Sequence, residues 1–278
     1  MTAQVFIIVL AAALMHATWN AVVKGAADRT ITFGLVSAGH TLPALAAVFF
    51  LPLPDLAMIP YIIASTVIHW GYYYLLNMSY RVGDLSLVYP IARGSTPLLV
   101  AIPAFLFLGE ELSLEGWAGL LLISGGIMIL SFRPSSTGRP RLAILLALGT
   151  AITIAAYSLL DGLGVRISDK AFSYIAWLFV AEGLIVFYIF STRMERLRAL
   201  SRKQILIGLS GGVLSALAYA LALYAKTLAP LGMVSALRET SVIFAALIGL
   251  FWFGEGPARP RLIAAVIVST GIIMLAMS

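Results

Sequence analysis

Two arginines lie in long apolar stretches, where a charged side chain is costly and therefore indicates a function. Arg93 lies within VGDLSLVYPIARGSTPLLVAIPAFLFLGEEL (82–112), and Arg238 lies 145 positions later in a stretch of the same design. A charge in the middle of a membrane span costs roughly 2.5–3.5 kcal/mol on insertion scales. Each guanidinium is therefore a candidate anchor for a substrate carboxylate or phosphate. The alternative is an internal ion pair that only holds the bundle together, with Glu182 and Glu239 as partners for Arg238.

Acidic residues within the apolar stretches are candidates for coupling transport to an ion. Glu182, in FVAEGLIVFY, is isolated among apolar residues. It is either a proton-coupling carboxylate or a structural partner for an arginine. Glu239 is a second candidate, and because it follows Arg238 directly, the two side chains point about 100° apart on a helix. Glu110 and Glu255 each follow a glycine at a predicted helix end, where a C-cap and a short turn explain them.

A polar stripe in the first apolar stretch predicts part of a cavity lining. His16, Trp19 and Asn20 are spaced i, i+3, i+4 and therefore share one helix face. Polar residues on a membrane helix are expected to point inward, toward a cavity or a partner helix. Packing or an interfacial belt is the alternative for the aromatic residues of the chain. Three tyrosines complete the predicted substrate-binding set: Tyr74, Tyr89 and Tyr219.

Other residue types give no indication of catalysis. The chain contains no cysteine, and no Walker loop, zinc-ligand spacing or nucleophile elbow occurs in it. His40 and His69 have no polar company at helical spacing, and Asp161 is expected to meet water near a helix end. We therefore expect neither an enzyme nor a bound cofactor or metal.

Composition predicts an integral membrane protein. The chain is 61% hydrophobic and 11% charged, whereas soluble domains carry about 25% charged residues. The net charge of +6 lies mainly between apolar stretches, so it concerns membrane orientation rather than nucleic acid. The expected partners are the lipid bilayer and a small-molecule substrate; the oligomeric state is open, with a monomer plausible.

Apolar stretches of membrane-spanning length fill the chain. A spanning helix needs about 20 mainly apolar residues. This length predicts an all-α protein of ten transmembrane helices: 3–23, 31–51, 56–80, 85–108, 114–132, 142–160, 172–190, 205–225, 231–253 and 262–276. The polar stretch 133–141, rich in Pro, Ser and Arg, predicts a linker between residues 1–132 and residues 142–278.

The two halves repeat each other at an offset of 145. This offset places Arg93 on Arg238, Gly109 on Gly254, and Tyr74 on Tyr219. Each half has an odd number of predicted spans, so the halves must cross the bilayer in opposite senses. Such inverted repeats place the substrate near the midplane, between the halves.

These features resemble the EamA-type transporters of the drug/metabolite transporter superfamily. The resemblance rests on the two five-span halves, the arginine in the fourth and ninth spans, and the Gly-Glu that closes each. It implies a ten-helix bundle with a central cavity, and alternating-access transport of small polar metabolites such as amino acids, sugars or drugs. The stretch HATWNAVVK (16–24) resembles a branch associated with phosphonate utilisation. A flippase for a lipid or lipid-linked precursor is the alternative function.

The distribution of basic residues and the resemblance disagree on orientation. Connectors after odd-numbered spans carry 13 Lys or Arg, against three after even-numbered spans, which include Lys226. The positive-inside rule then places the odd connectors in the cytoplasm and both termini outside. The family resemblance implies both termini in the cytoplasm. We expect a multi-pass protein of the cell (inner) membrane, with its sidedness and transport direction open.

Overall fold

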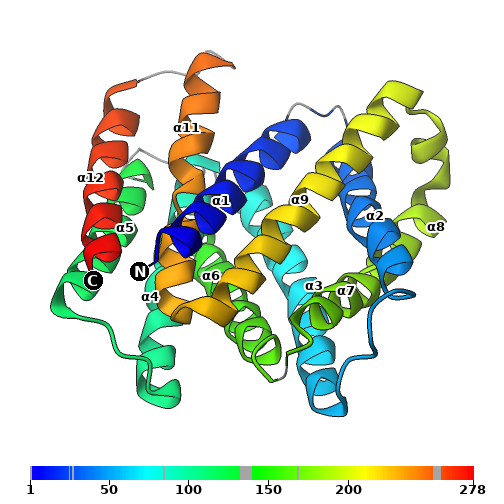
Figure 1. Ribbon diagram of the computed structural model, residues 1–278. Coiled ribbons are helices and arrows are strands. Elements are labelled where there is room, and N and C mark those ends of the chain that lie inside the picture. The colour runs from blue at the N-terminus through cyan, green and yellow to red at the C-terminus, as the bar shows by residue number, and fades with distance from the viewer. Residues whose placement is uncertain are drawn as a thin grey trace.

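The computed structural model describes residues 2–24, 26, 28–83, 85–131, 140–167, 169–252 and 258–278. Within these residues every regular element is a helix, as Figure 1 shows. The elements are α1 (Ala3–Lys24), α2 (Arg29–Ala47), η1 (Leu56–Met58), α3 (Ile59–Val82), α4 (Leu85–Leu108), α5 (Leu114–Met128), η2 (Ile129–Ser131), α6 (Pro140–Gly164), α7 (Ala171–Glu182), α8 (Leu184–Arg198), α9 (Arg202–Leu228), α10 (Leu231–Arg238), α11 (Ser241–Phe251) and α12 (Ala258–Met277).

The helices have the lengths and surfaces of a membrane protein. Within the described residues, seven segments are long and apolar enough to span a bilayer, and α5 and α12 contain shorter apolar helices. Helix α3 is long enough at 24 residues but carries more polar side chains. Large apolar side chains such as Phe50, Phe107 and Phe187 are exposed on the surface, where lipid rather than water suits them. The prediction of an all-α membrane protein is therefore confirmed.

Two of the predicted spans are broken rather than continuous. The predicted span 231–253 divides into α10 and α11 at Glu239 and Thr240. There the backbone N–H groups of Glu239 and Thr240 donate to the carbonyls of Ala236 and Leu237, both at 3.1 Å. These bonds reach three residues back, as in a 3₁₀ turn, which within a helix often marks a functional hinge.

The predicted span 172–190 divides into α7 and α8 at Gly183. A Cβ atom at Gly183 would lie 2.5 Å from Cγ2 of Thr41. The Thr41 hydroxyl donates to the carbonyl of Phe179 at 3.2 Å, so α2 contacts α7 close to the break. The interruption therefore lies where two helices pack too closely for a side chain at residue 183.

The helices pack into two groups, one of α4, α5, α10, α11 and α12 and the other of α2, α7 and α8. Helices α1, α3, α6 and α9 join the two groups. Helix α5 lies against α12 at the left of Figure 1, and α2 lies against α8 at the right. Helix α1 crosses α9, while α6 packs on both α3 and α4. Helix α10 contacts α4, which brings the two arginine-bearing segments together. This contact positions the candidate site.

Close glycine packing between α2 and α9 gives a first testable prediction. A Cβ at Gly39 would overlap the carbonyl oxygen of Leu209 and lie 2.7 Å from Cα of Gly212. We expect Gly39→Ala to destabilise the protein by about 1–3 kcal/mol, because backbone must move to make room. Thermal unfolding of purified protein in detergent measures the effect.

Gly71→Ala is the matched control, because Gly71 is also in a helix but nothing lies within 4 Å of the place that its Cβ atom would occupy. Alanine is favoured over glycine in a helix by up to about 1 kcal/mol. We therefore expect an unchanged or slightly raised melting temperature for Gly71→Ala. Equal effects of the two substitutions would contradict the close approach of α2 and α9.

Candidate functional site

Arg93 and Glu239 form a buried ion pair between the two halves of the chain. Arg93 lies on α4, and its Nε is 2.8 Å from Oε2 of Glu239 at the break between α10 and α11. Its Nη2 also donates to the hydroxyl of Ser241 at 3.4 Å. Both charged side chains are buried. Glu239 therefore neutralises Arg93, whereas the sequence had suggested it as a partner of Arg238.

Among the residues that the structure describes, Arg238 is a buried cation without a carboxylate partner. Among the described residues, none of the ion pairs within 4.0 Å includes Arg238, although it is only 8% exposed. Its guanidinium carbon lies 5.0 Å from the centroid of the Tyr219 ring. A cation over an aromatic face is stabilised by the ring quadrupole, but the guanidinium donors do not gain an acceptor from it. We call Arg93, Glu239, Arg238 and Tyr219 the central cluster.

Two further predicted residues interact with the charges of the central cluster, and a third is hydrogen-bonded to one of them. Tyr89 on α4 interacts with the charges of Arg93, Arg238 and Glu239. His16 on α1 interacts with the charges of both arginines. The Trp19 indole donates to Nδ1 of His16 at 3.3 Å. The α1 face that carries His16 and Trp19 is therefore directed, at least at His16, toward Arg93 and Arg238.

The third member of that stripe bonds within its own helix. The Asn20 amide donates to the carbonyl of His16 at 2.7 Å, one turn earlier. Such a side-chain bond to the i−4 carbonyl satisfies one of the two amide hydrogens. The role of Asn20 in a substrate site stays a prediction.

Tyr74 lies away from the central cluster. It is 65% exposed and shares a face of α3 with the exposed residues Ile63, Val67 and Trp70. This spacing of three and four residues describes a lipid-facing stripe. The sequence prediction that Tyr74 lines the site with Tyr219 is therefore not met by its position.

The burial patterns of α3 and α9 agree at an offset of 146 rather than at the offset of 145 used in the sequence comparison. At an offset of 145, the buried Ser65 of α3 corresponds to the exposed Ser210 of α9. An offset of 146 instead places each buried residue described in α3 on a buried residue of α9: Ile62 on Gly208, Ser65 on Gly211, Thr66 on Gly212, His69 on Ser215 and Ser79 on Ala225. One residue turns a helix by about 100°. The equivalent of Tyr219 is then Tyr73, which interacts with Glu182 and Tyr157.

Asp161 is a site residue that the sequence interpretation missed. It was expected to meet water, but it is fully buried on α6. Its Oδ1 accepts a hydrogen bond from the hydroxyl of Tyr174 at 2.8 Å, and its Oδ2 accepts a short one from the hydroxyl of Tyr219. The carboxylate therefore fixes the ring on which Arg238 lies.

Glu182 lies between two histidines rather than beside an arginine. Its Oε1 is 3.4 Å from Nδ1 of His69, and its Oε2 is 3.9 Å from Nδ1 of His40. The His69 ring stacks on Tyr157 with 3.9 Å between centroids. Among the described residues, no three acidic or histidine side chains are grouped as metal ligands. We call His40, His69 and Glu182 the acid–histidine cluster.

Lys226 is a buried cation, although the charge count placed it in a connector. It lies on α9 at 1% exposure. Its Nζ donates to the carbonyl and to the hydroxyl of Ser158 on α6, both at 2.7 Å. The Ser158 hydroxyl is in turn 3.4 Å from that of Ser235 on α10. Lys226 therefore contributes to the interior and not to the charge that orients the protein.

The end of α4 is tied to the other half of the chain. Gly109 adopts a positive φ of 65°, as expected for a glycine at a helix C-terminus. Glu110 then accepts hydrogen bonds from Nη1 of Arg166 and from the backbone N–H of Leu231, both at 2.7 Å. Arg166 also donates to the carbonyls of Lys226 and Ala229. Glu110 thus caps the start of α10, a role beyond the turn predicted for it; Glu255 lies outside the described residues.

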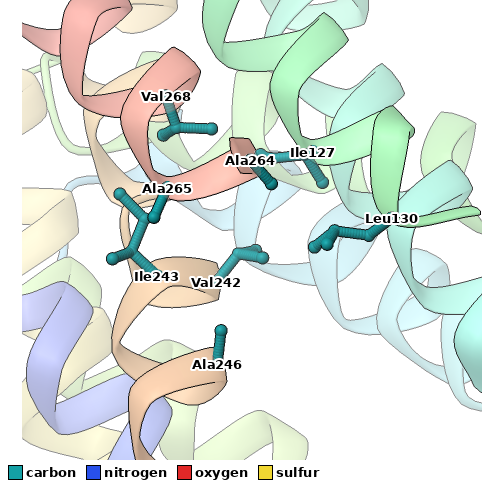
Figure 2. Close-up of a pocket in the computed structure, with 8 residues that line it drawn as sticks. All are labelled: Ile127, Leu130, Val242, Ile243, Ala246, Ala264, Ala265 and Val268. Carbon is teal, nitrogen blue, oxygen red and sulfur yellow. The ribbon is translucent and has the colours of Figure 1, made fainter. Parts of the chain in front are cut away.

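A small pocket elsewhere in the bundle is unsuited to a polar ligand. It lies between the α5–η2 segment, α11 and α12, and Figure 2 shows only apolar side chains around it. Its lining consists of Ile127, Leu130, Val242, Ile243, Ala246, Ala264, Ala265 and Val268. None of these can donate or accept a side-chain hydrogen bond, so the central cluster is the better candidate site.

Comparisons with known proteins agree with this architecture. Residues 141–277 match the model of the EamA-like transporter family. None of the curated proteins matches the chain. Of the solved structures, 26 chains match, including one described only as "Crystal structure of protein", at a TM-score of 0.81 and 15% identity over 100% of this chain and 99% of that chain. That likeness shows a shared fold, and the resemblance of residues 16–24 to a phosphonate-associated branch stays a prediction. The second half of the chain, residues 141–277, therefore matches the EamA-like transporter family, which is part of the drug/metabolite transporter superfamily.

Proposed function

We propose that this protein transports a small organic molecule with an anionic group, by alternating access, and that Arg238 binds that group. The observation that carries the proposal is the buried guanidinium of Arg238, which lies over Tyr219 with no carboxylate within ion-pair distance among the described residues. A buried cation without a counter-ion is unfavourable. A carboxylate or phosphonate from a substrate would supply that counter-ion.

The neighbouring ion pair supports the choice of Arg238 over Arg93. Arg93 already has Glu239 at 2.8 Å, so its charge is neutralised within the protein. A guanidinium can bind a planar carboxylate or a phosphonate through two parallel hydrogen bonds. Arg238 retains its donors for this purpose, while Arg93 and Glu239 hold α4 against the break that follows Arg238. Tyr89 and His16 are predicted lining residues that interact with the charge of Arg238.

Helix contacts support a relation between the halves of the kind that alternating access needs. Under an inverted repeat, each contact between the halves should have a counterpart in which the roles of the halves are exchanged. The contact of α3 with α6 corresponds to that of α9 with α1, and the contact of α4 with α6 corresponds to that of α1 with α10 and α11. The α5–α12 contact pairs equivalent helices. We infer two inverted five-span repeats, with the breaks in spans seven and nine as hinges.

One membrane face is held closed by contacts between the halves. Glu110 of the first half binds Arg166 and the N-terminus of α10 in the second half. Lys170 is paired with Asp55 at 2.5 Å on the same face. In the proposed cycle, these contacts break when the site opens toward that face, because the ends of α4 and α10 must separate.

Arg238→Gln tests the proposed function. We expect the wild-type protein in detergent to be stabilised against heat by L-glutamate or methylphosphonate but not by glucose, since only a ligand that binds the folded state raises its stability. Arg238→Gln should lose this stabilisation, and proteoliposomes containing it should lose uptake of the stabilising anion.

Arg198→Gln is the matched control, because Arg198 is an exposed arginine in the last turn of α8. It should keep both anion-induced stabilisation and uptake. Uptake that survives Arg238→Gln would contradict the assignment of the anchor. Transfer of a labelled phospholipid between leaflets, with no effect of either anion, would favour the flippase instead.

A further inference from the structure

We propose that Glu182 is a proton-binding carboxylate, and that its protonation accompanies binding of the substrate anion at Arg238. This inference rests on the proposed function and adds the ion to which transport is coupled. It predicts that a proton and a monoanion cross the membrane together, without net movement of charge.

The geometry of the acid–histidine cluster assigns the proton to Glu182. The Nδ1 of His69 lies 2.9 Å from the carbonyl oxygen of Ser65. A carbonyl only accepts, so the neutral His69 ring carries its hydrogen on Nδ1, where it can also face Glu182 at 3.4 Å. This neutral ring is not a counter-ion for Glu182, which lies 10% exposed between the two rings and has no lysine or arginine within 4.0 Å among the described residues. An isolated buried carboxylate is costly, and protonation relieves that cost.

Groups on helices α2, α3, α6 and α9 define the setting of Glu182. Helix α2 contributes His40, and α3 contributes His69 and Tyr73. The second carboxylate, Asp161 on α6, is bonded to two tyrosine hydroxyls and interacts with His69 and Ser65. Helix α9 contributes Tyr219 and Lys226, of which Lys226 interacts with Asp161. No arginine or lysine among the described residues pairs with Glu182 within 4.0 Å.

A chain of ring contacts connects Glu182 with Arg238. The centroids of His69 and Tyr219 are 6.1 Å apart. Tyr219 carries the guanidinium of Arg238 on its ring at 5.0 Å. The proton site and the anion site are therefore separated by two side chains in the interior, where charges are weakly screened.

Charge balance makes the two binding events cooperative. The buried charged side chains among the described residues are three cations and three acids: Arg93, Lys226, Arg238, Asp161, Glu182 and Glu239. With the histidines neutral, these charges cancel. A monoanion pairs directly with Arg238, but the interior as a whole then carries one negative charge in excess, because the carboxylate of Glu182 has no lysine or arginine partner among the described residues. Such a buried excess charge is unfavourable. Protonation of Glu182 removes this excess, so by linkage each ligand increases the affinity for the other equally.

The wild-type protein in proteoliposomes provides the first test. With L-glutamate or methylphosphonate as the labelled probe and an acid exterior, a gradient of one pH unit should drive accumulation of about tenfold at equilibrium for a one-to-one coupling. A potassium-diffusion potential should not change this ratio. Protein-free vesicles give the baseline for passive entry.

The outcomes separate the two proposals. Probe entry that requires Arg238 but reaches only equal concentrations on both sides overturns the proton coupling and leaves the proposed function intact. Accumulation that responds to the membrane potential also overturns the one-to-one coupling. If neither probe enters, or if the probes enter equally well with Arg238→Gln, the proposed function itself is overturned.

Glu182→Gln tests the assignment of the residue. Glutamine keeps the size and hydrogen-bonding capacity of the side chain but cannot take up the proton. The accumulation ratio should fall from about tenfold to about one. Glu195→Gln, an exposed acid on α8, should keep the wild-type ratio. A tenfold ratio that survives Glu182→Gln would overturn the assignment. In a second measurement, addition of either anion to the wild-type protein in weakly buffered detergent should cause uptake of one proton for each anion bound.

Discussion

Glu239→Gln is expected to destabilise the folded protein by about 3–5 kcal/mol, because it leaves the buried charge of Arg93 without its partner. Arg93 and Glu239 are 2.8 Å apart, and their side chains are only 7% and 3% exposed. The remaining contact of Arg93, to the Ser241 hydroxyl at 3.4 Å, cannot neutralise it. Chemical or thermal unfolding in detergent measures this loss.

The double substitution Arg93→Met with Glu239→Gln separates the charge from the shape of the pair. Removing both charges avoids the isolated buried cation, and replacing buried ion pairs with uncharged side chains is often neutral or stabilising. We expect the double variant to regain most of the stability that Glu239→Gln loses. Transport should still be lost in it, because the tie between α4 and the α10–α11 break is gone. Additive losses from the two single substitutions would show that the pair is not coupled.

The helical fold follows from the sequence because its cause is local. Apolar length and the absence of alternating patterns are enough to predict helices that satisfy their own backbone in a bilayer. The breaks at Gly183 and at Glu239–Thr240 were not predicted. The first depends on Thr41 approaching from α2, and the second accompanies an ion pair with Arg93 on α4. Neither partner is near in sequence, so local apolarity predicted continuous spans.

The helix register explains where the repeat alignment agrees with the burial of the side chains and where it does not. Arg93 and Arg238, which the offset of 145 pairs, are both buried, and they lie on α4 and α10, which contact each other. In α3 and α9 the burial pattern follows an offset of 146, and the ungapped alignment selected Tyr74 instead of Tyr73. Helix burial periodicity in α3, read alongside α9, would have revealed the shift. Identity counts alone could not, because apolar membrane helices share many residues by composition.

The acid–histidine cluster was not visible in the sequence, because its members lie on three helices. His40, His69 and Glu182 each look isolated among apolar neighbours, and only the packing of α2, α3 and α7 unites them. The sequence did contain an indication of such partners. An ionisable side chain inside a membrane helix is costly, so each of these residues predicts a polar partner on another helix. The same argument applies to Asp161 and Lys226. The predicted spans 142–160 and 205–225 end one residue before them, so both residues were placed outside the membrane interior.

Asp161→Ala is expected to have the second large effect, because Asp161 accepts hydrogen bonds from two buried hydroxyls. The hydroxyls of Tyr174 and Tyr219 would each lose their acceptor, at about 1–3 kcal/mol for each unsatisfied donor. Asp161→Asn keeps one acceptor oxygen and should cost less than Asp161→Ala. The exposed Asp169→Asn, in the connector that follows α6, is the control and should leave stability unchanged.

The same substitution also tests whether Asp161 positions the substrate site through Tyr219. Without the carboxylate, the Tyr219 ring is no longer fixed beneath Arg238, so the two should reorient together. We therefore expect Asp161→Asn to weaken stabilisation by the anion that binds the wild-type protein, even at temperatures where the variant is fully folded. Tyr219→Phe removes only the hydroxyl and should reproduce that weakening. If Asp161→Asn lowers the melting temperature but leaves anion affinity at the wild-type value, Asp161 stabilises the bundle without positioning Arg238.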